Sequence, residues 1–422
     1  MKSRNRTADL LPDALWIQLH GQDIGICLKC SDGRNKLVFS PDYIHQPASN
    51  RMTLTLGQLQ DPDYLLQTRG HHQRLEPVLS NLLPEGVLRD WYVHHLKIHA
   101  QDEFVLLAMT GRNLAGAVTV VPLDAPLPDW RSLQGIDIRY APMAEQENDT
   151  HFSLSGIQMK FSGKLQDGRY RIGNDFDGEQ WILKTPSTVH PHVPANEYSA
   201  MKLAESAGVE IPEIRLIPLS SLDTLPILQL PDETDVYAIR RFDRGPAGKK
   251  IHTEDFAQVF NLYPHEKYSR ANYEQIGRTL LRFSTAGIAD VCAMAQRLLV
   301  NILLANGDAH IKNWSLIYPD GILPRLAPAY DIVSTLPYIP TDSGPALNMA
   351  REKDWYRISF RHFRQWAERV GAPWPLVQSH LEQSLEKARS LWRNLLKDLP
   401  MDGRHKAVLQ QHWHHLHPDF RF

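Results

Sequence analysis

The segment NGDAHIKN, residues 306–313, has the residue types and the spacing that phosphoryl transfer requires. It follows an apolar helical pattern and precedes a strand-like run, which predicts a polar loop between a helix and a strand. Asp308 and Asn313 stand five residues apart, the spacing at which a kinase loop offers a carboxylate to the substrate hydroxyl and an amide oxygen to Mg²⁺. A second acid, Asp331, follows after two short predicted strands joined at Asp320-Gly321.

These three oxygen-bearing side chains suit an anionic substrate. A transferring phosphoryl group needs a divalent cation on hard oxygen ligands, and Asn313 and Asp331 can supply them while Asp308 orients the attacking hydroxyl. His310 or Lys312 could add positive charge beside the transferred group. Asn-Gly-Asp alone describes a plain turn equally well, because these residues favour turns. The complete arrangement favours phosphoryl transfer.

A second set of candidates lies earlier in the chain, at residues 152–160 and at Lys184. FSLSGIQMK contains a single glycine, so it indicates either a phosphate-binding turn or a kinked strand. Lys184 stands between apolar neighbours in a predicted strand, where an ammonium needs a partner such as ATP phosphates. Glu197, on the next helix, could orient Lys184, although a surface glutamate in the first turn of a helix is the favoured interpretation.

The elements that must position these residues form three successive parts. From Ala14 to Phe39 apolar and polar residues alternate, which predicts a small antiparallel sheet, and helical patterns cover 75–98 and 103–109. The segment 122–147 is rich in Pro and Asp. We therefore expect the first domain to comprise residues 1–125.

Residues 126–245 are predicted to form a sheet accompanied by one helix, and residues 246–422 a mostly helical lobe. Asp167-Gly168 and Asp177-Gly178 are hairpin signals, and the helix of the second part is predicted over 196–207. In the third part helices are predicted to begin at Thr253 and to cover 273–285, 290–304 and 375–399. The fold class is therefore α+β, with a cleft between a β-rich and a helical lobe.

The composition excludes a disordered chain and a strongly basic nucleic-acid-binding domain. Hydrophobic residues make up 42% and charged residues 22%, and the formal net charge is -2. DNA contact is therefore expected only locally or through a partner. Four basic residues on one predicted helix could touch a DNA backbone, but a solvated helix face is favoured; they are Lys387, Arg389, Arg393 and Lys397.

Localisation and metal content follow from short features of the sequence. The first residues are polar and no apolar stretch reaches the ~20 residues that span a bilayer, so we expect a cytoplasmic protein without a membrane partner. Three cysteines fit a reducing compartment. Cys27 and Cys30 form a C-x-x-C without a second pair, and the histidine-rich tail 411–420 lacks a recognised ligand spacing. Neither is expected to bind a metal.

Motifs along most of the chain resemble those of the HipA family, the kinase toxins of bacterial type II toxin-antitoxin modules. They are NLLPEG (81–86), GRNLAGAV (111–118), FSLSGIQMKF (152–161), WILKTPS (181–187), PANEYSAMKLAESAGVEIPE (194–213), RRFDR (240–244), HTEDF (252–256), NGDAHIKN (306–313) and LAPAYDIVST (326–335). The resemblance implies a two-lobed protein-kinase-like fold, related to phosphoinositide kinases, behind a small N-terminal domain.

The resemblance also implies roles for individual residues. Asp308 corresponds to the catalytic aspartate, Asn313 and Asp331 to the Mg²⁺ ligands, and Lys184 to the lysine that contacts the ATP phosphates. The implied ATP-binding residues are Ser155, Gly156, Ile157, Gln158, Met159, Lys160, Lys184, Arg240, Arg241, Phe242, His310, Ile311, Lys312, Asn313 and Tyr330.

Two departures from the family pattern limit how far these roles can be assigned to this chain. The adenine hinge of the family often begins with Glu where this chain has Arg240, so we expect a backbone contact there and not a side-chain contact. Ser153 occupies the position that the family autophosphorylates, which expels the phosphate loop and stops the kinase. Because Ser155 lies in the same loop, both serines are candidates.

The implied function is an ATP- and Mg²⁺-dependent serine/threonine kinase that acts as the toxin of a two-gene module. Its implied partners are a small helix-turn-helix antitoxin of the HipB kind, operator DNA through that antitoxin, and a protein of the translation machinery such as an aminoacyl-tRNA synthetase. Growth arrest is the implied outcome. Two alternatives stay open: a phosphoinositide-type lipid kinase, and an inactive kinase-like corepressor.

Overall fold

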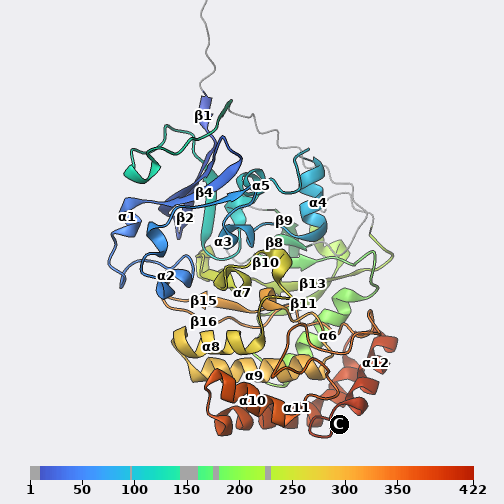
Figure 1. The fold of residues 1–422 in the computed structure, drawn as a ribbon. Coiled ribbons are helices and arrows are strands. Elements are labelled where there is room, and N and C mark those ends of the chain that lie inside the picture. Colours follow the sequence, from blue (N-terminus) through green and yellow to red (C-terminus); the bar gives the residue numbers. More distant parts are fainter. Residues whose placement is uncertain (1–9, 96, 143–159, 174–179, 224–229) are drawn as a thin grey trace, which may run out of the picture.

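The chain folds into three parts that follow one another in the sequence (Figure 1). The structure is a computed structural model and describes residues 10–95, 97–142, 160–173, 180–223 and 230–422. A β-rich N-terminal domain lies at one end, a second sheet lies beside it, and the helices α8 to α12 form the other end. The α+β fold class with a helical C-terminal lobe is confirmed.

The N-terminal domain is built on a five-stranded antiparallel sheet of order β5-β4-β3-β2-β6. Its strands are β2 (Ala14–Leu19), β3 (Gln22–Lys29), β4 (Arg34–Phe39), β5 (Arg69–His72) and β6 (Val118–Pro122). Its helices are α1 (Pro41–Ile44), α2 (Gly57–Gln60), α3 (Pro77–Ser80), α4 (Gly86–His95) and α5 (Glu103–Thr110). One face of the sheet packs on these helices through a core that includes Leu15, Ile17 and Leu107.

The opposite face of this sheet is covered by the segment that follows β6. Leu133 and Ile138 pack against Ile26 and Leu28 of the sheet, and β7 (Tyr140–Pro142) pairs with β1 (Leu10–Pro12). The predicted boundary at residue 125 is therefore too early, because the domain continues to residue 142. Proline and aspartate are frequent in this segment, yet its few apolar residues are enough to hold it on the sheet.

The second part is a six-stranded sheet of order β11-β13-β10-β8-β9-β12, in which only the β9–β12 pairing is parallel. Its elements are β8 (Lys160–Gln166), β9 (Arg169–Ile172), β10 (Gln180–Lys184), α6 (Val193–Ser206), β11 (Ile214–Pro218), β12 (Leu222–Asp223) and β13 (Asp235–Arg240). The hairpin between β8 and β9 turns at Asp167-Gly168, as predicted; both residues have positive φ. The predicted turn at Asp177-Gly178 lies outside the described residues.

The third part combines a three-stranded sheet with the helices of the C-terminal lobe. The elements are β14 (His252–Asp255), α7 (Phe256–Val259), α8 (Tyr273–Phe283), α9 (Ile288–Leu303), β15 (Ser315–Tyr318), β16 (Arg325–Leu326), α10 (Phe360–Val370), α11 (Trp374–Asp398) and α12 (Gly403–His415). The predicted helix start at Thr253 is wrong: Thr253 pairs with Ile317 in the sheet. Asp255 is the N-cap, and its carboxylate accepts from the amides of Ala257 and Gln258.

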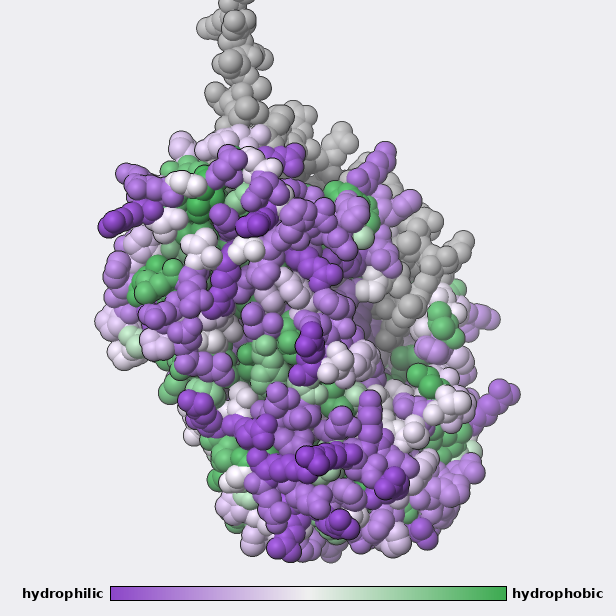
Figure 2. All heavy atoms as spheres, in the orientation of Figure 1, coloured by the Kyte–Doolittle hydropathy of each residue, from purple (hydrophilic) through white to green (hydrophobic). Residues whose placement is uncertain are grey.

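Figure 2 shows a mostly hydrophilic surface on the face seen in Figure 1, with hydrophobic side chains in separate small patches. Within the described ranges, no helix combines the length and the apolar character that crossing a bilayer demands.

Candidate active site

The three parts of the chain meet around a cavity of about 220 Å³. Eight residues that the sequence analysis named line it: Lys160, Lys184, Arg240, Arg241, Phe242, Lys312, Tyr330 and Asp331. The N-terminal domain contributes Asn81, Leu82 and Ala115 to the same walls. Charged and flat apolar groups therefore share one cavity, which suits a ligand with a flat ring and an anionic tail.

Lys184 is the best-buried cation of the cavity. It lies on β10, and its ammonium binds Glu197 of α6 at 2.5 Å and the carboxylate of Asp331. Burial alone would lower the pKa of Lys184, but the two carboxylates outweigh it and raise the pKa, so the ammonium stays charged. The surface interpretation of Glu197 is wrong: the glutamate is 3% exposed and holds Lys184 in place.

Asp331 joins two lysines that come from different strands. Its second carboxylate oxygen lies 3.4 Å from the Nζ atom of Lys160 on β8. Burial would raise the pKa of Asp331, yet Lys160 and Lys184 together hold it well below its usual range. The backbone φ of Asp331 is +54°, a left-handed conformation that aspartate tolerates better than most residues. The anionic carboxylate is thus fixed at the cavity wall.

The loop 306–313 follows α9 and is held by its own side chains. The Asn306 carboxamide oxygen accepts from the Asp308 amide at 3.1 Å, and the Gly307 amide donates to the Thr335 hydroxyl at 2.8 Å. The Asn313 carboxamide nitrogen donates to the Asp308 carbonyl at 2.9 Å. The turn interpretation of Asn-Gly-Asp is therefore right locally, and the turn also fixes Asp308 relative to Asn313.

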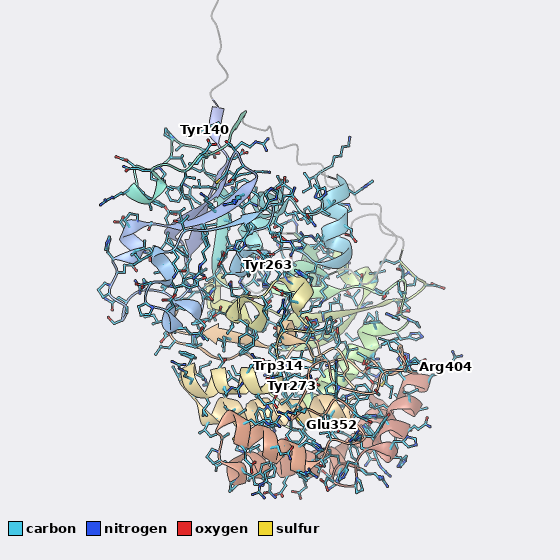
Figure 3. The ribbon with its side chains drawn as sticks, viewed as in Figure 1. Tyr140, Tyr263, Tyr273, Trp314, Glu352 and Arg404 are labelled. Carbon is cyan, nitrogen blue, oxygen red and sulfur yellow. The ribbon has the colours of Figure 1, made fainter. Side chains whose placement is uncertain are left out.

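Two aromatic residues support the loop from the C-lobe. The hydroxyl of Tyr273 and the indole N–H of Trp314 both donate to the carbonyl of Ala309, at 2.9 and 3.3 Å. Their rings meet edge to face with centroids 5.9 Å apart, and Figure 3 places both near the centre of the molecule. Because both side chains are fully buried, the backbone beside Asp308 cannot shift without repacking the core.

Asp308 itself faces a tyrosine. The phenol of Tyr268 donates to its Oδ1 atom at 2.6 Å, and Tyr268 is 47% exposed. Burial, together with this hydrogen bond, raises the pKa of Tyr268, so the phenol keeps its proton. Sequence reasoning missed Tyr268, since nothing in its local pattern connects it to a loop 40 residues later.

The expected extra positive charge from His310 and Lys312 is not free to act. Burial lowers the pKa of His310 and outweighs the opposing effect of Asp308, which leaves a neutral imidazole at neutral pH. The ammonium of Lys312 binds Asp255 at 2.7 Å and the carboxamide oxygen of Asn81 at 2.9 Å. Ile311 is fully buried and serves the core.

The loop and the segment of Asp331 are tied together through Tyr330. Its hydroxyl donates to the Lys312 carbonyl at 2.8 Å, next to Asn313, and contacts the Ser315 hydroxyl at 2.5 Å. The residues flanking this hydrogen bond are Asn313 and Asp331, the expected cation ligands. The ring of Tyr330 also lies 5.7 Å from that of Phe242, so the two aromatic residues form one apolar wall.

The segment Arg240 to Phe242, the expected adenine hinge, contacts both the second sheet and the N-terminal domain. The amides of Arg240 and Arg241 donate to the carbonyls of Glu213 and Gln180. The buried guanidinium of Arg241 binds Asp243 at 2.7 Å and the Asn113 carboxamide at 3.0 Å. The Arg241 side chain thus points to the N-terminal domain, and Phe242 and Asp243 also line the cavity.

The donor set around Asp331 suits a hard cation. Because the Asn313 nitrogen is engaged by the Asp308 carbonyl, the Asn313 oxygen is the atom left for a ligand. Among the residues that the structure describes, no three His, Cys, Asp or Glu side chains form a metal-ligand group. A cation here would therefore combine Asp331, Asn313 and phosphate oxygens, as Mg²⁺ sites in phosphotransferases commonly do.

The remaining expected residues, Ser153 and Ser155 through Met159, lie outside the described residues. Asn81, Glu85, Asp255 and Tyr268 were missed, although the first three stand in the segments 81–86 and 252–256 that carried the family resemblance. No spacing rule connects those segments to the loop 306–313.

Comparisons with known proteins identify the family of this chain. The family model of the HipA N-terminal domain matches residues 15–121, and that of the HipA-like C-terminal domain matches residues 152–392. A protein of Sinorhizobium fredii named "Putative kinase Y4dM" is 37% identical over 405 residues, which cover 94% of this chain and 95% of that one.

More distant relatives are named as kinases too. The serine/threonine-protein kinase toxin HipA of Shewanella oneidensis is 24% identical, over 83% of this chain and 84% of its own. The solved complex of Shewanella oneidensis HipA with HipB and operator DNA contains a chain with a TM-score of 0.69 and 20% identity, covering 94% of both chains. This structural match establishes the shared fold.

Proposed function

The chain belongs to the HipA family, and on this premise we propose that it is an ATP- and Mg²⁺-dependent serine/threonine protein kinase. One observation carries the proposal: Lys184 and Asp331, which form a charged group with the buried Glu197, line the same cavity as an aromatic wall. Phosphates would meet Lys160 and Lys184, and the purine would meet Phe242 and Tyr330.

Each group of the site has a task in the transfer. Lys184 and Lys160 would neutralise phosphate charge, and Glu197 keeps Lys184 oriented. Asp331 and Asn313 would hold Mg²⁺, which when bound neutralises the charge that develops on the phosphate oxygens. Asp308 would accept a hydrogen bond from the substrate hydroxyl and orient that oxygen for attack on the terminal phosphate. Because the loop is rigid, catalysis would come mainly from positioning.

We further propose that the kinase is the toxin of a type II module, located in the cytoplasm. A HipB-like helix-turn-helix protein would be its antitoxin and would connect it to operator DNA, which fits a chain whose own net charge is -2. The substrate would be a protein of the translation machinery, for example an aminoacyl-tRNA synthetase, with growth arrest as the outcome. Autophosphorylation of Ser153 or Ser155 would inactivate the kinase.

The test is transfer of label from γ-labelled ATP. The full chain is incubated with Mg²⁺, with candidate protein substrates and with phosphoinositide vesicles, beside Asp308→Ala. We expect label in protein on Ser or Thr and a loss of about 10²- to 10⁴-fold in the variant. Asp398→Ala, an exposed aspartate at the end of α11, serves as the matched control. Label in lipid alone would support a lipid kinase, and equal absence of label everywhere would support a corepressor.

A further inference from the structure

The N-terminal domain reaches into the kinase site itself. Asn81 and Leu82, which follow α3, and Ala115, which precedes β6, line the same cavity as Lys184 and Asp331. A domain that served only to bind other proteins would have no need to form these walls. The segment 81–85 also contacts the loop 306–313 through Lys312.

Asn81 connects three segments and is 7% exposed. Its carboxamide nitrogen donates to the carbonyl of Pro77 at 2.9 Å and to that of Leu262, after α7, at 2.7 Å. Its carboxamide oxygen accepts from the Nζ atom of Lys312 at 2.9 Å. The oxygen of this side chain thus joins the N-terminal domain to the loop 306–313, and its nitrogen joins the domain to the segment after α7.

Lys312 is held from both sides of the domain boundary. Glu85 of the N-terminal domain lies 3.1 Å from its Nζ atom, and Asp255 of the C-lobe lies 2.7 Å from it. Burial would lower the pKa of Lys312, but Asp255 and Glu85 outweigh it and raise the pKa. Glu85 also pairs with Lys267 at 3.5 Å, beside Tyr268. The positive charge of Lys312 is thus compensated by two carboxylates from different domains.

The backbone of Lys312 connects these interdomain contacts to the proposed cation ligands. Its carbonyl accepts from the Tyr330 hydroxyl at 2.8 Å, and the next residue along the chain is Asn313. A change in the position of Lys312 therefore moves Asn313 directly and the segment of Asp331 through Tyr330.

A second contact holds the two domains together near the hinge. The Gly116 amide donates to the Asp243 carboxylate at 2.7 Å, and a Cβ atom on Gly116 would lie 2.7 Å from the Thr253 amide. This close approach keeps Ala115 at the cavity wall. These two contacts therefore help to fix the position of the N-terminal domain over the site.

We propose that Asn81 and Glu85 are positioning residues of the kinase site, which act through Lys312 to hold Asn313 and Asp331 in their working arrangement. This inference rests on the proposed kinase function. It differs from simple domain docking in its consequence: loss of the contact lowers the rate of phosphoryl transfer at saturating ATP, and not only the stability of the protein.

The experiment compares two interdomain contacts of the full chain. Asn81→Ala removes the side-chain oxygen that accepts from Lys312, whereas the main-chain carbonyl of residue 81, 3.1 Å from the Lys312 Nζ atom, is kept. Lys250→Met removes a contact outside the cavity, where Lys250 binds the Thr119 hydroxyl at 2.6 Å. We expect Asn81→Ala to lower kcat at least tenfold at saturating ATP. Lys250→Met should leave kcat within twofold of the wild-type value, even if its unfolding temperature falls by as much as that of Asn81→Ala.

Conservative variants make the result specific. Asn81→Asp keeps an oxygen for Lys312 but loses the N–H donors to Pro77 and Leu262, so we expect its kcat to lie between those of Asn81→Ala and the wild type. Glu85→Gln, at a residue that is partly exposed, provides a variant expected to fold if Asn81→Ala does not. Unchanged kcat in Asn81→Ala and Glu85→Gln, or equal losses in Lys250→Met, would overturn the inference. An inactive wild type would instead reject the proposed kinase function.

Discussion

At the scale of single residues, Asp308 already has the hydrogen bond that a substrate would make. The Tyr268 phenol donates to Asp308 Oδ1 at 2.6 Å, and its ring packs edge to face on His310 with centroids 5.0 Å apart. A substrate hydroxyl that is to be oriented by Asp308 needs an oxygen of the same carboxylate. We expect the substrate hydroxyl to approach Oδ1, so that it competes with Tyr268, and the exposed tyrosine is the group able to move.

Tyr268→Phe is expected to tighten the binding of a protein or peptide substrate. The variant keeps the ring on His310 but removes the competing donor, and a hydrogen bond to a charged acceptor contributes about 1.5 kcal/mol, or roughly tenfold. We expect KM for the phosphate acceptor to fall by up to about tenfold, with KM for ATP unchanged. Steady-state kinetics with both substrates varied measures this, and a fall in kcat would show that Tyr268 assists catalysis.

The sequence predicted those site residues that lie close together along the chain. Asp308 and Asn313 belong to one loop, so their spacing carries the information, and Lys184 stands out as a cation in an apolar strand. The partners of these residues could not be found in this way. Tyr268, and Asn81 for Lys312, come from segments whose approach depends on tertiary packing and not on any local period.

At the scale of elements, the segment 53–57 of the N-terminal domain docks on β14 and β15 through two buried titratable side chains. The Leu56 amide donates to the Glu254 carboxylate at 2.7 Å, and the His252 imidazole hydrogen bonds the Leu54 carbonyl at 2.8 Å. Tyr318 of β15 also donates to Glu254. Burial raises the pKa of Glu254 to about 7 and lowers the pKa of His252 to about 4.

These two shifts have opposite effects on stability. The folded pKa of Glu254 lies above its unfolded value of 4.5, so its contribution is complete below pH 4.5 and is lost as the pH rises through 7. The folded pKa of His252 lies below its unfolded value of 6.5, so stability rises with pH between about 4 and 6.5. In the wild type the two slopes oppose each other in the range from 4.5 to 6.5.

Glu254→Gln should reveal the slope of His252. We expect the free energy of unfolding of the variant to rise from pH 4.5 to 6.5 more steeply than that of the wild type, by at most about 1.4 kcal/mol per pH unit. Urea unfolding at several pH values measures it. His252→Gln should change the slope in the opposite direction, and parallel pH profiles for wild type and Glu254→Gln would contradict the assignment.

Elements with a clear period were predicted well, and short ones at the domain boundary were not. The alternation in residues 14–39 predicted β2, β3 and β4, and the helical period predicted α8, α9 and α11. The short strand β14 was predicted to be the start of a helix, because four residues carry too little periodicity. The true N-cap, Asp255, lies two residues after the predicted start at Thr253 and was missed.

At the scale of the whole molecule, the cavity exists only because three parts of the chain meet. The largest apolar core runs from Leu56 in the N-terminal domain to Phe420 near the C-terminus, so the parts are not independently packed. Sequence composition indicated a boundary near residue 125 and a cleft between two lobes. It could not indicate that the first domain forms a wall of that cleft, since this depends on contacts between residues about 230 positions apart, such as Asn81 with Lys312.

Nucleotide binding should therefore stabilise all three parts together. At a concentration 100 times the Kd, ATP with Mg²⁺ adds about 2.7 kcal/mol to the folded state, enough to raise Tm by several degrees. We expect slower amide hydrogen exchange in residues 77–86 as well as near Lys184 and Asp331. Calorimetry and hydrogen exchange with and without the nucleotide measure this. Protection confined to the two lobes, with unchanged exchange in 77–86, would show that the N-terminal domain does not respond to the ligand.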